Sequence, residues 1–195
     1  LRKSAKARLA INQIIELNTG LTLSDLTYRA QNSGDKLERP DISAINENGK
    51  EVLLIEAKFW ASLTKNQPNE YINRLKDNSV IIFLVPTLRE RVIYEEILFR
   101  ISQQFSDIER DTENLKIKLN RSNKFILIKS WNKILNTIKT ELTQENNQTL
   151  ISDIDQIIGF CETIDSNSFQ PIIDSDLSPE IAKIFPEKIE NSIKH

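Results

Sequence analysis

The chain has few of the side chains that enzymes use as nucleophiles or as acid–base groups near neutral pH. Its 195 residues include one cysteine, one histidine and no methionine. One cysteine excludes an internal disulfide and a thiolate metal site, as is typical of a reducing cytoplasm. The single histidine, His195, is the last residue, which argues against Ser–His and Cys–His catalytic pairs. Carboxylates, lysines and hydroxyls remain as candidates for chemistry.

The sequence also lacks an apolar run long enough to span a membrane and an N-terminal signal pattern. The formal net charge is −2, so contact with nucleic acid would depend on a local basic patch. A composition of 39% hydrophobic and 28% charged residues is typical of a soluble globular domain. We therefore expect a cytoplasmic protein without membrane contact. Because it begins at Leu1 and contains no methionine, we expect either a domain excised from a longer chain or a chain whose given part starts late.

Hydrophobic periodicity predicts an α/β fold in which helices flank a mixed sheet. Strands are expected at 23–31, 41–46, 51–59, 79–85 and 124–129, and helices at 4–18, 68–75, 90–105, 131–142 and 149–165. Residues 106–114 are interpreted as a polar connection. A boundary near Glu145 divides the chain into a core, 1–145, and a C-terminal helical extension, 146–195, that packs on the core.

Residues 39–59 form the most informative stretch. Asn48-Gly49 separates two apolar segments and predicts a two-residue hairpin turn. In that register Ile45 faces Val52 and Asp41 faces Glu56, with the Cβ atoms of a facing pair roughly 5 Å apart. Lys58 lies on the same face, two residues beyond Glu56. Opposed like charges destabilise a sheet, so the hairpin indicates a bound cation.

Pro40-Asp41 followed by Glu56-Ala57-Lys58 on paired strands resembles the PD-(D/E)xK nuclease superfamily, whose fold is the restriction-endonuclease-like fold. The segment from Phe59 to Thr64, with Asn66-Gln67-Pro68 and Tyr71, is similar to a branch of bacterial nuclease-like proteins. The C-terminal part resembles the same branch at Phe160-Cys161, Asp165, Phe169 and Asp176-Leu177-Ser178-Pro179. The order of elements extends the resemblance over most of the chain.

The resemblance implies a Mg²⁺-dependent deoxyribonuclease, an endonuclease-type hydrolase in which Mn²⁺ substitutes for Mg²⁺. Asp41, Glu56 and the Ala57 carbonyl would hold the cation, and Lys58 would orient water or offset charge in the transition state. Lys58 is alternatively a structural partner of Glu56. Gln67 matches a helper position of such nucleases, or else it is a cap or surface residue. Glu16 is either an additional acidic group facing the sheet or an ordinary solvated glutamate.

Residues 115–140 contain seven basic residues and no acidic one: Lys116, Lys118, Arg121, Lys124, Lys129, Lys133 and Lys139. They are interpreted either as a basic face that contacts DNA phosphates, with the first four as candidates, or as a solvated surface. Trp60 is interpreted as packing beneath the following helix, with stacking on a base as the alternative. The competing functional hypothesis is a catalytically silent nuclease-like module. It would bind nucleic acid or protein, as a homo-oligomer or within a larger assembly.

Overall fold

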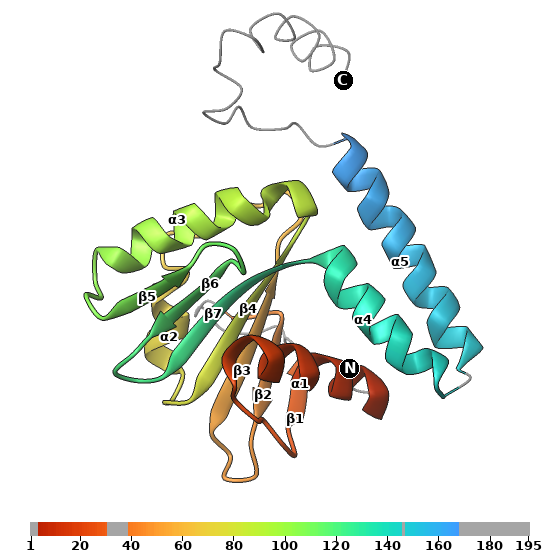
Figure 1. The fold of residues 1–195 in the computed structure, drawn as a ribbon, viewed down its shortest axis with the longest axis horizontal. Helices are drawn as coiled ribbons and strands as arrows, with labels where there is room; N and C mark the ends of the chain where they lie inside the picture. Colours follow the sequence, from red (N-terminus) through yellow and green to blue (C-terminus); the bar gives the residue numbers. More distant parts are fainter. Residues whose placement is uncertain (1–3, 31–38, 146, 168–195) are drawn as a thin grey trace, which may run out of the picture.

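A mixed sheet of seven strands forms the centre of the computed structural model, which describes residues 4–30, 39–145 and 147–167 (Figure 1). The strands are β1 (Thr27–Ala30), β2 (Ile42–Ile45), β3 (Glu51–Ala57), β4 (Ser79–Val85), β5 (Ile108–Asp111), β6 (Lys116–Leu119) and β7 (Lys124–Ser130). Their order across the sheet is β1-β2-β3-β4-β7-β6-β5. The β3–β4 and β4–β7 pairs are parallel and the other pairs are antiparallel. The predicted α/β class is confirmed.

Helices cover both faces of the sheet. They are α1 (Ala5–Thr19), α2 (Asn69–Arg74), α3 (Glu90–Ser102), α4 (Trp131–Thr143) and α5 (Gln148–Asn167), with a 3₁₀ turn, η1 (Thr87–Arg89), before α3. The ends of α1 have clear local causes. The Ser4 hydroxyl accepts a hydrogen bond from the Ala7 N–H, and Gly20 ends the helix in the left-handed conformation at φ 72°.

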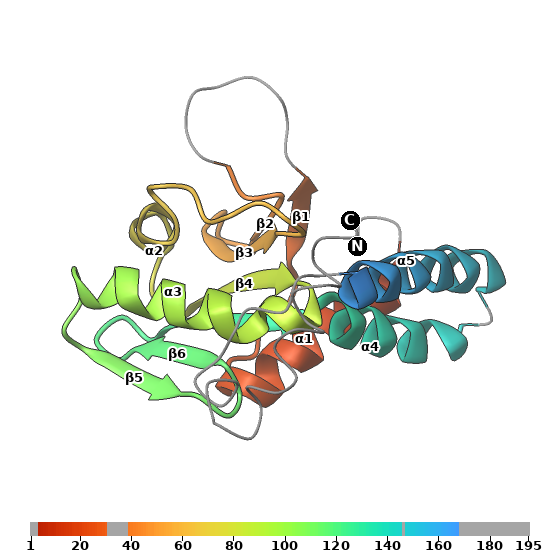
Figure 2. The same ribbon diagram turned by 90° about the horizontal axis from the view of Figure 1, so that it is seen from above.

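Two hydrophobic clusters lie on opposite faces of the sheet. Helices α1 and α4 pack on the face that carries Leu53 and Ile55, whereas α2 and α3 pack on the face that carries Leu54 and Phe83. Coverage on both faces explains why the central strands are continuously apolar. Helices α4 and α5 lie side by side (Figures 1 and 2), and Cys161 of α5 joins the α1/α4 cluster as a buried side chain.

The predicted extension from residue 146 therefore begins with a helix that packs on α4, while its part beyond residue 167 lies outside the described residues. The boundary between core and extension stays a prediction. Within the described ranges, no helix combines the length and apolar character needed to cross a bilayer.

The β2–β3 hairpin differs from its prediction in two ways that cancel. The Asn46 N–H donates to the Lys50 carbonyl at 2.9 Å, so the closed loop has three residues, 47–49, rather than two, and Gly49 ends it at φ 69°. Ile45 faces Glu51 rather than Val52. A bulge then shifts the register between Ala44 and Ile45, so that Ile42 faces Ile55. This inner register matches the predicted one, so Asp41 and Glu56 remain on opposed positions.

Two other predictions about strands are wrong. The first strand begins at Thr27 rather than at residue 23, because residues 20–26 form an irregular loop. The segment 106–114 is not simply a connection, because Ile108–Asp111 forms β5 and pairs with β6, a strand missing from the prediction. Both strands have only four residues, and β5, Ile-Glu-Arg-Asp, does not alternate polar with apolar side chains, so the signal in the sequence is weak.

Candidate active site

Asp41 and Glu56 come together at the carboxyl end of β3. Asp41 directly precedes β2, and its Oδ2 accepts a hydrogen bond of 2.7 Å from the Ala57 N–H. The next N–H, of Lys58, donates to the Leu84 carbonyl of β4 at 2.7 Å, so Lys58 continues the parallel ladder. Open α/β sheets bind ligands at the carboxyl ends of their parallel strands. The two carboxylates therefore lie at the sheet edge where this architecture places functional sites.

Glu56 is buried, with 6% of its surface exposed, and its carboxylate has three protein partners. Lys58 Nζ lies 2.9 Å from Oε1, and Gln67 Nε2 donates to the same oxygen at 3.0 Å. The Tyr71 hydroxyl donates to Oε2 at 2.8 Å and accepts from Gln67 Nε2 at 2.9 Å. Burial of a carboxylate is tolerated only with such pairing. The network fixes the orientation of Glu56.

The site retains oxygen atoms that can bind a cation. A carboxylate offers about four lone pairs, so the three donors to Glu56 leave one position open. In the part of the chain that the structure describes, Asp41 Oδ1 makes no hydrogen bond, since only Oδ2 is engaged by Ala57. The N–H and C=O of one strand residue point to the same side, so the Ala57 carbonyl also faces the Asp41 side. These atoms are hard oxygen ligands.

The pKa of Asp41 is raised above its usual range, chiefly because burial disfavours the charged form. The Ala57 N–H opposes this rise, the negative charge of Glu56 adds to it, and the positive charge of Lys58 opposes it. The two carboxylates therefore lie close enough for the charge of Glu56 to disfavour ionisation of Asp41. A cation between them would remove that repulsion.

The segment from Phe59 to Gln67 is held by two arginines. Arg89 Nη1 donates to the carbonyls of Phe59 at 2.6 Å and of Ala61 at 3.3 Å. Arg100 of α3 donates to the carbonyls of Leu63, Thr64 and Gln67 and pairs with Glu96. These contacts fix the backbone that carries Gln67 toward Glu56.

Sequence reasoning missed Arg89, Arg100 and the role of Tyr71, which was named only as part of the family resemblance. Tyr71 lies four residues after Gln67, the spacing that places two side chains on one helical face. That spacing is a signal the sequence does contain. The two arginines act on backbone carbonyls from about 30 residues away, and no local pattern indicates such contacts.

The structure does not join Glu16 to this site. Glu16 is exposed near the C-terminal end of α1, and its Oε1 accepts a hydrogen bond from the Thr22 hydroxyl at 3.3 Å. This exposure agrees with an ordinary solvated glutamate, and a role for Glu16 in catalysis stays an untested prediction. Gln67, in contrast, is 3% exposed and bonded to Glu56, so it is neither a surface glutamine nor a side-chain cap of α2.

The predicted basic residues do not share one face. Lys116 and Lys118 alternate with Ile117, which belongs to the α2/α3 cluster, and therefore lie on the α1/α4 side of the sheet. Lys116 pairs with Asp111 at 3.1 Å, and Lys118 Nζ lies 5.6 Å from the ring centre of Phe125. A single basic face on the sheet therefore cannot include both these two lysines and Lys124, which lies on the α2/α3 side.

Lys124 lies on the opposite side and donates to the Ile72 carbonyl at 2.9 Å. Arg121 is exposed in the β6–β7 turn, where its N–H donates to Asp107. Lys129 is 6% exposed and donates to Asn18 Oδ1 at 2.7 Å, and burial lowers the pKa of its ammonium group. Contact between any of these residues and DNA stays a prediction.

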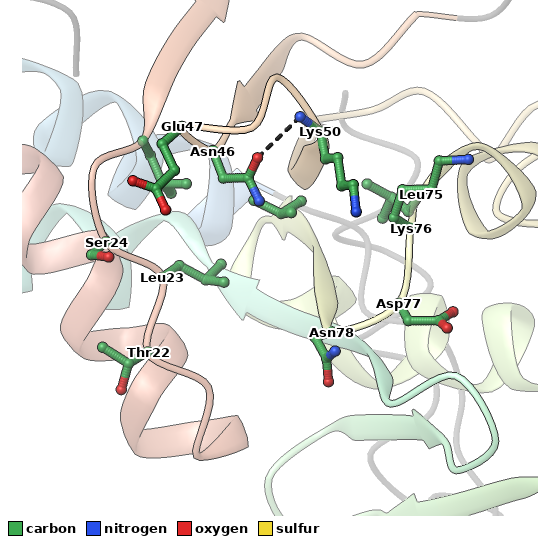
Figure 3. Close-up of a pocket in the computed structure, with 12 residues that line it drawn as sticks. Thr22, Leu23, Ser24, Asn46, Glu47, Lys50, Leu75, Lys76, Asp77 and Asn78 are labelled. Carbon is green, nitrogen blue, oxygen red and sulfur yellow. Dashed lines mark hydrogen bonds between the residues drawn. The ribbon is translucent and has the colours of Figure 1, made fainter.

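A cavity of about 690 Å³ lies at the other end of the strands (Figure 3). The hairpin loop, the loop after α1 and the loop after α2 surround it, and Figure 3 shows Lys50, Lys76, Glu47 and Asp77 at its rim. These four charged side chains are exposed, and Val52 and Leu75 contribute apolar lining. Buried and perturbed ionisable groups cluster at functional sites, and the charged groups at this cavity are exposed, so we place the candidate site at Asp41 and Glu56.

Comparisons of this chain with protein-family models, with curated proteins and with solved structures gave no match. Within residues 4–30, 39–145 and 147–167, no three or more Asp, Glu, His or Cys side chains gather in a possible metal site. The candidate site thus has two carboxylates and one backbone carbonyl. The chemistry of those groups is the basis for its function.

Proposed function

We propose that this chain is a Mg²⁺-dependent nuclease that hydrolyses phosphodiester bonds in DNA. The observation that carries the proposal is the opposed pair Asp41 and Glu56, with Lys58 beside Glu56, at the carboxyl end of β3. A restriction-endonuclease-like arrangement of the core is part of the proposal. It is supported by the antiparallel β2–β3 hairpin continuing into the parallel strands β4 and β7.

The donor set fits a hard divalent cation. Mg²⁺ binds through one or two carboxylates and keeps several waters, which matches Asp41, Glu56 and the Ala57 carbonyl. Mn²⁺ has the same preference for oxygen and would substitute. When bound, such a cation polarises the phosphate and lowers the pKa of a bound water.

The residues of the chain have separate tasks around that cation. Gln67 and Tyr71 keep the Glu56 carboxylate in one orientation. The Ala57 N–H does the same for Asp41. Lys58 balances the charge of Glu56 while no cation is bound, and its flexible stem allows the ammonium group to contact a phosphate oxygen once a cation is present. Lys58 then stabilises charge that develops on the phosphate.

The second candidate function is a catalytically silent module that binds nucleic acid or a protein within a larger assembly. The observation that favours it is the engagement of Glu56 by three protein donors. In this alternative Lys58 permanently replaces the cation. Both candidates use the same residues, and they differ in whether a divalent cation displaces Lys58 from Glu56.

Calorimetric titration with Mn²⁺ and a DNA cleavage assay with Mg²⁺ or Mn²⁺ separate the two candidates. We expect wild-type protein to bind the cation and cleave DNA, and Asp41→Asn to lose both activities while unfolding cooperatively. Glu16→Gln is the matched control, because it neutralises an exposed carboxylate outside the site. DNA binding without cation binding or cleavage by the wild type would support the silent module. Cleavage retained by Asp41→Asn and Lys58→Met would refute the assigned site.

A further inference from the structure

Trp60 is a large, exposed aromatic side chain close in sequence to Lys58 of the candidate site. It follows Lys58 by two residues and is 59% exposed, whereas Lys58 is 7% exposed. The prediction that Trp60 packs beneath the following helix is therefore wrong. Its exposed neighbours on the same segment, from Ala61 to Asn66, are small or polar, and Leu63 is the buried exception. Trp60 is thus the exposed aromatic side chain of a segment whose other exposed residues, from Ala61 to Asn66, are small or polar.

The backbone on both sides of Trp60 is fixed. The Phe59 ring stacks on Trp131 with ring centres 4.9 Å apart and an interplanar angle of 6°, and Phe160 contacts it edge-on at 5.7 Å. Arg89 then binds the carbonyls of Phe59 and Ala61, one residue before and one after Trp60. Exposed aromatic side chains on a rigid support lose little conformational entropy when they bind a planar ligand.

From these contacts we propose that Trp60 stacks on an unpaired base of the substrate next to the phosphate held at Asp41 and Glu56. This inference rests on the proposed nuclease function and specifies its substrate class. Bases inside a continuous duplex are covered on both faces by their neighbours, so an exposed indole has no base face to contact there. The substrate is DNA with single-stranded character at the cleaved bond, such as a gap, an overhang or a bulge.

Binding measured with Ca²⁺ in place of Mg²⁺ tests the stacking directly, using two DNA molecules that differ in one feature. The first has 2-aminopurine in a short single-stranded gap, and the second has the same sequence fully paired. We expect wild-type protein to bind the gapped DNA more tightly and to quench its 2-aminopurine fluorescence. Trp60→Leu, which keeps apolar bulk but has no aromatic face, should lose roughly 5- to 150-fold in affinity for gapped DNA, the range of one base–aromatic stack.

Two matched variants isolate the aromatic face. Trp60→Phe retains a ring and should keep most of the affinity and of the quenching. Phe99→Leu changes another exposed aromatic, 67% exposed on α3, and should leave both unchanged. The proposal is overturned if Trp60→Leu binds gapped DNA as wild type does. It is also overturned if Trp60→Phe is as weak as Trp60→Leu, or if Trp60→Leu weakens binding to the paired duplex equally.

These outcomes are distinguishable from failure of the nuclease function. If Asp41→Asn abolishes cleavage while Trp60→Leu changes nothing, the nuclease is supported and the stacking role is refuted. If no DNA is cleaved by any variant, but Trp60→Leu still loses quenching and affinity for gapped DNA, stacking is supported and hydrolysis is not. Thermal unfolding of Trp60→Leu should match that of wild type, because the replaced side chain is exposed and surface substitutions change stability little.

Discussion

Replacing Lys58 by methionine removes the positive charge beside Glu56 and keeps a side chain of similar length. Both partners of the ion pair are buried, with 8% of each side chain exposed. Breaking a buried pair by removing one partner costs about 3–5 kcal/mol, because the remaining charge is uncompensated. Glu56 keeps Gln67 and Tyr71 as donors, so we expect the lower end, about 3 kcal/mol.

That loss is large relative to the whole stability of a domain, about 5–15 kcal/mol. For a chain of this size, 1 kcal/mol corresponds to about 2–4 °C in Tm, so Lys58→Met should unfold about 6–12 °C below wild type without divalent cation. Mg²⁺ should then stabilise Lys58→Met more than wild type, because no ammonium group competes for Glu56. A cation at a concentration of about 100 Kd contributes about 2.7 kcal/mol, which is comparable to the loss.

Thermal unfolding of both proteins with EDTA and with Mg²⁺ measures these quantities. Lys124→Met is the matched control: among the described residues, Lys124 Nζ donates only to the Ile72 carbonyl, so this variant should lose about 1 kcal/mol with no dependence on Mg²⁺. Equal stabilisation of wild type and Lys58→Met by Mg²⁺ would show that the cation does not compete with Lys58. A loss no larger than that of Lys124→Met would refute the importance of the ion pair.

Three further predictions concern neighbouring features. The pKa of Asp41 is raised in the folded state, so the folded protein holds this proton more tightly than the unfolded chain does. Ionisation of Asp41 therefore lowers stability at pH values above the folded-state pKa, and this cost disappears as the pH falls from the folded-state pKa to the unfolded-state pKa. Asp41→Asn should therefore raise Tm at neutral pH without divalent cation and flatten the dependence of Tm on pH. Arg100→Ala removes the donors that hold the backbone carbonyls of the segment ending at Gln67. Calorimetry should then show Mn²⁺ affinity falling about 10- to 100-fold, as for other residues that support metal ligands. Gly49→Ala should cost about 1–2 kcal/mol in urea unfolding, because alanine is strained at φ 69° even though a new Cβ would meet no atom within 4 Å. Gly159 also has open space but lies in a helix, so Gly159→Ala should stabilise the protein by about 0.5–1 kcal/mol.

Local signals predicted the central elements well. The apolar run 79–85 gave β4 with its observed bounds, and the apolar stripe over 4–18, followed by Gly20, gave α1 to within one residue at each end. These signals depend only on neighbouring residues: a continuous apolar run, apolar residues at helical spacing and a glycine stop. The sheet order was not predicted from the sequence, because pairing between β4 and β7 joins segments about 45 residues apart.

The candidate site was predicted in part through two errors that cancelled. A two-residue turn at Asn48-Gly49 was expected, whereas the loop has three residues and a bulge leaves Val52 without a partner opposite it. The extra residue on β3 restores the register at Ile55, so Glu56 still opposes Asp41. A bulge depends on packing of the completed sheet, which the sequence of the hairpin does not reveal.

Lysines were the least predictable residues. The spacing of Lys116, Lys118 and Lys124 indicated one basic segment, yet alternation along strands divides them between two faces. Lys129 was predicted on the surface and is buried against Asn18 of α1, a contact between residues 111 positions apart. Charge counts along a chain do not show which tertiary partner a side chain will have.

The position of strands within the sheet has a consequence for folding in solution. The outermost strands of the described sheet, β1 and β5, have four residues each and carry Arg29, Glu109 and Arg110, features that hinder pairing with another chain. The inner strands β4 and β7 have seven residues each and contain the apolar runs 80–85 and 125–128, a composition that aggregates readily when exposed. Their parallel pairing forms late, because distant segments must meet. Variants that slow this step should therefore be lost as insoluble aggregates during refolding, even when their native state is as stable as wild type.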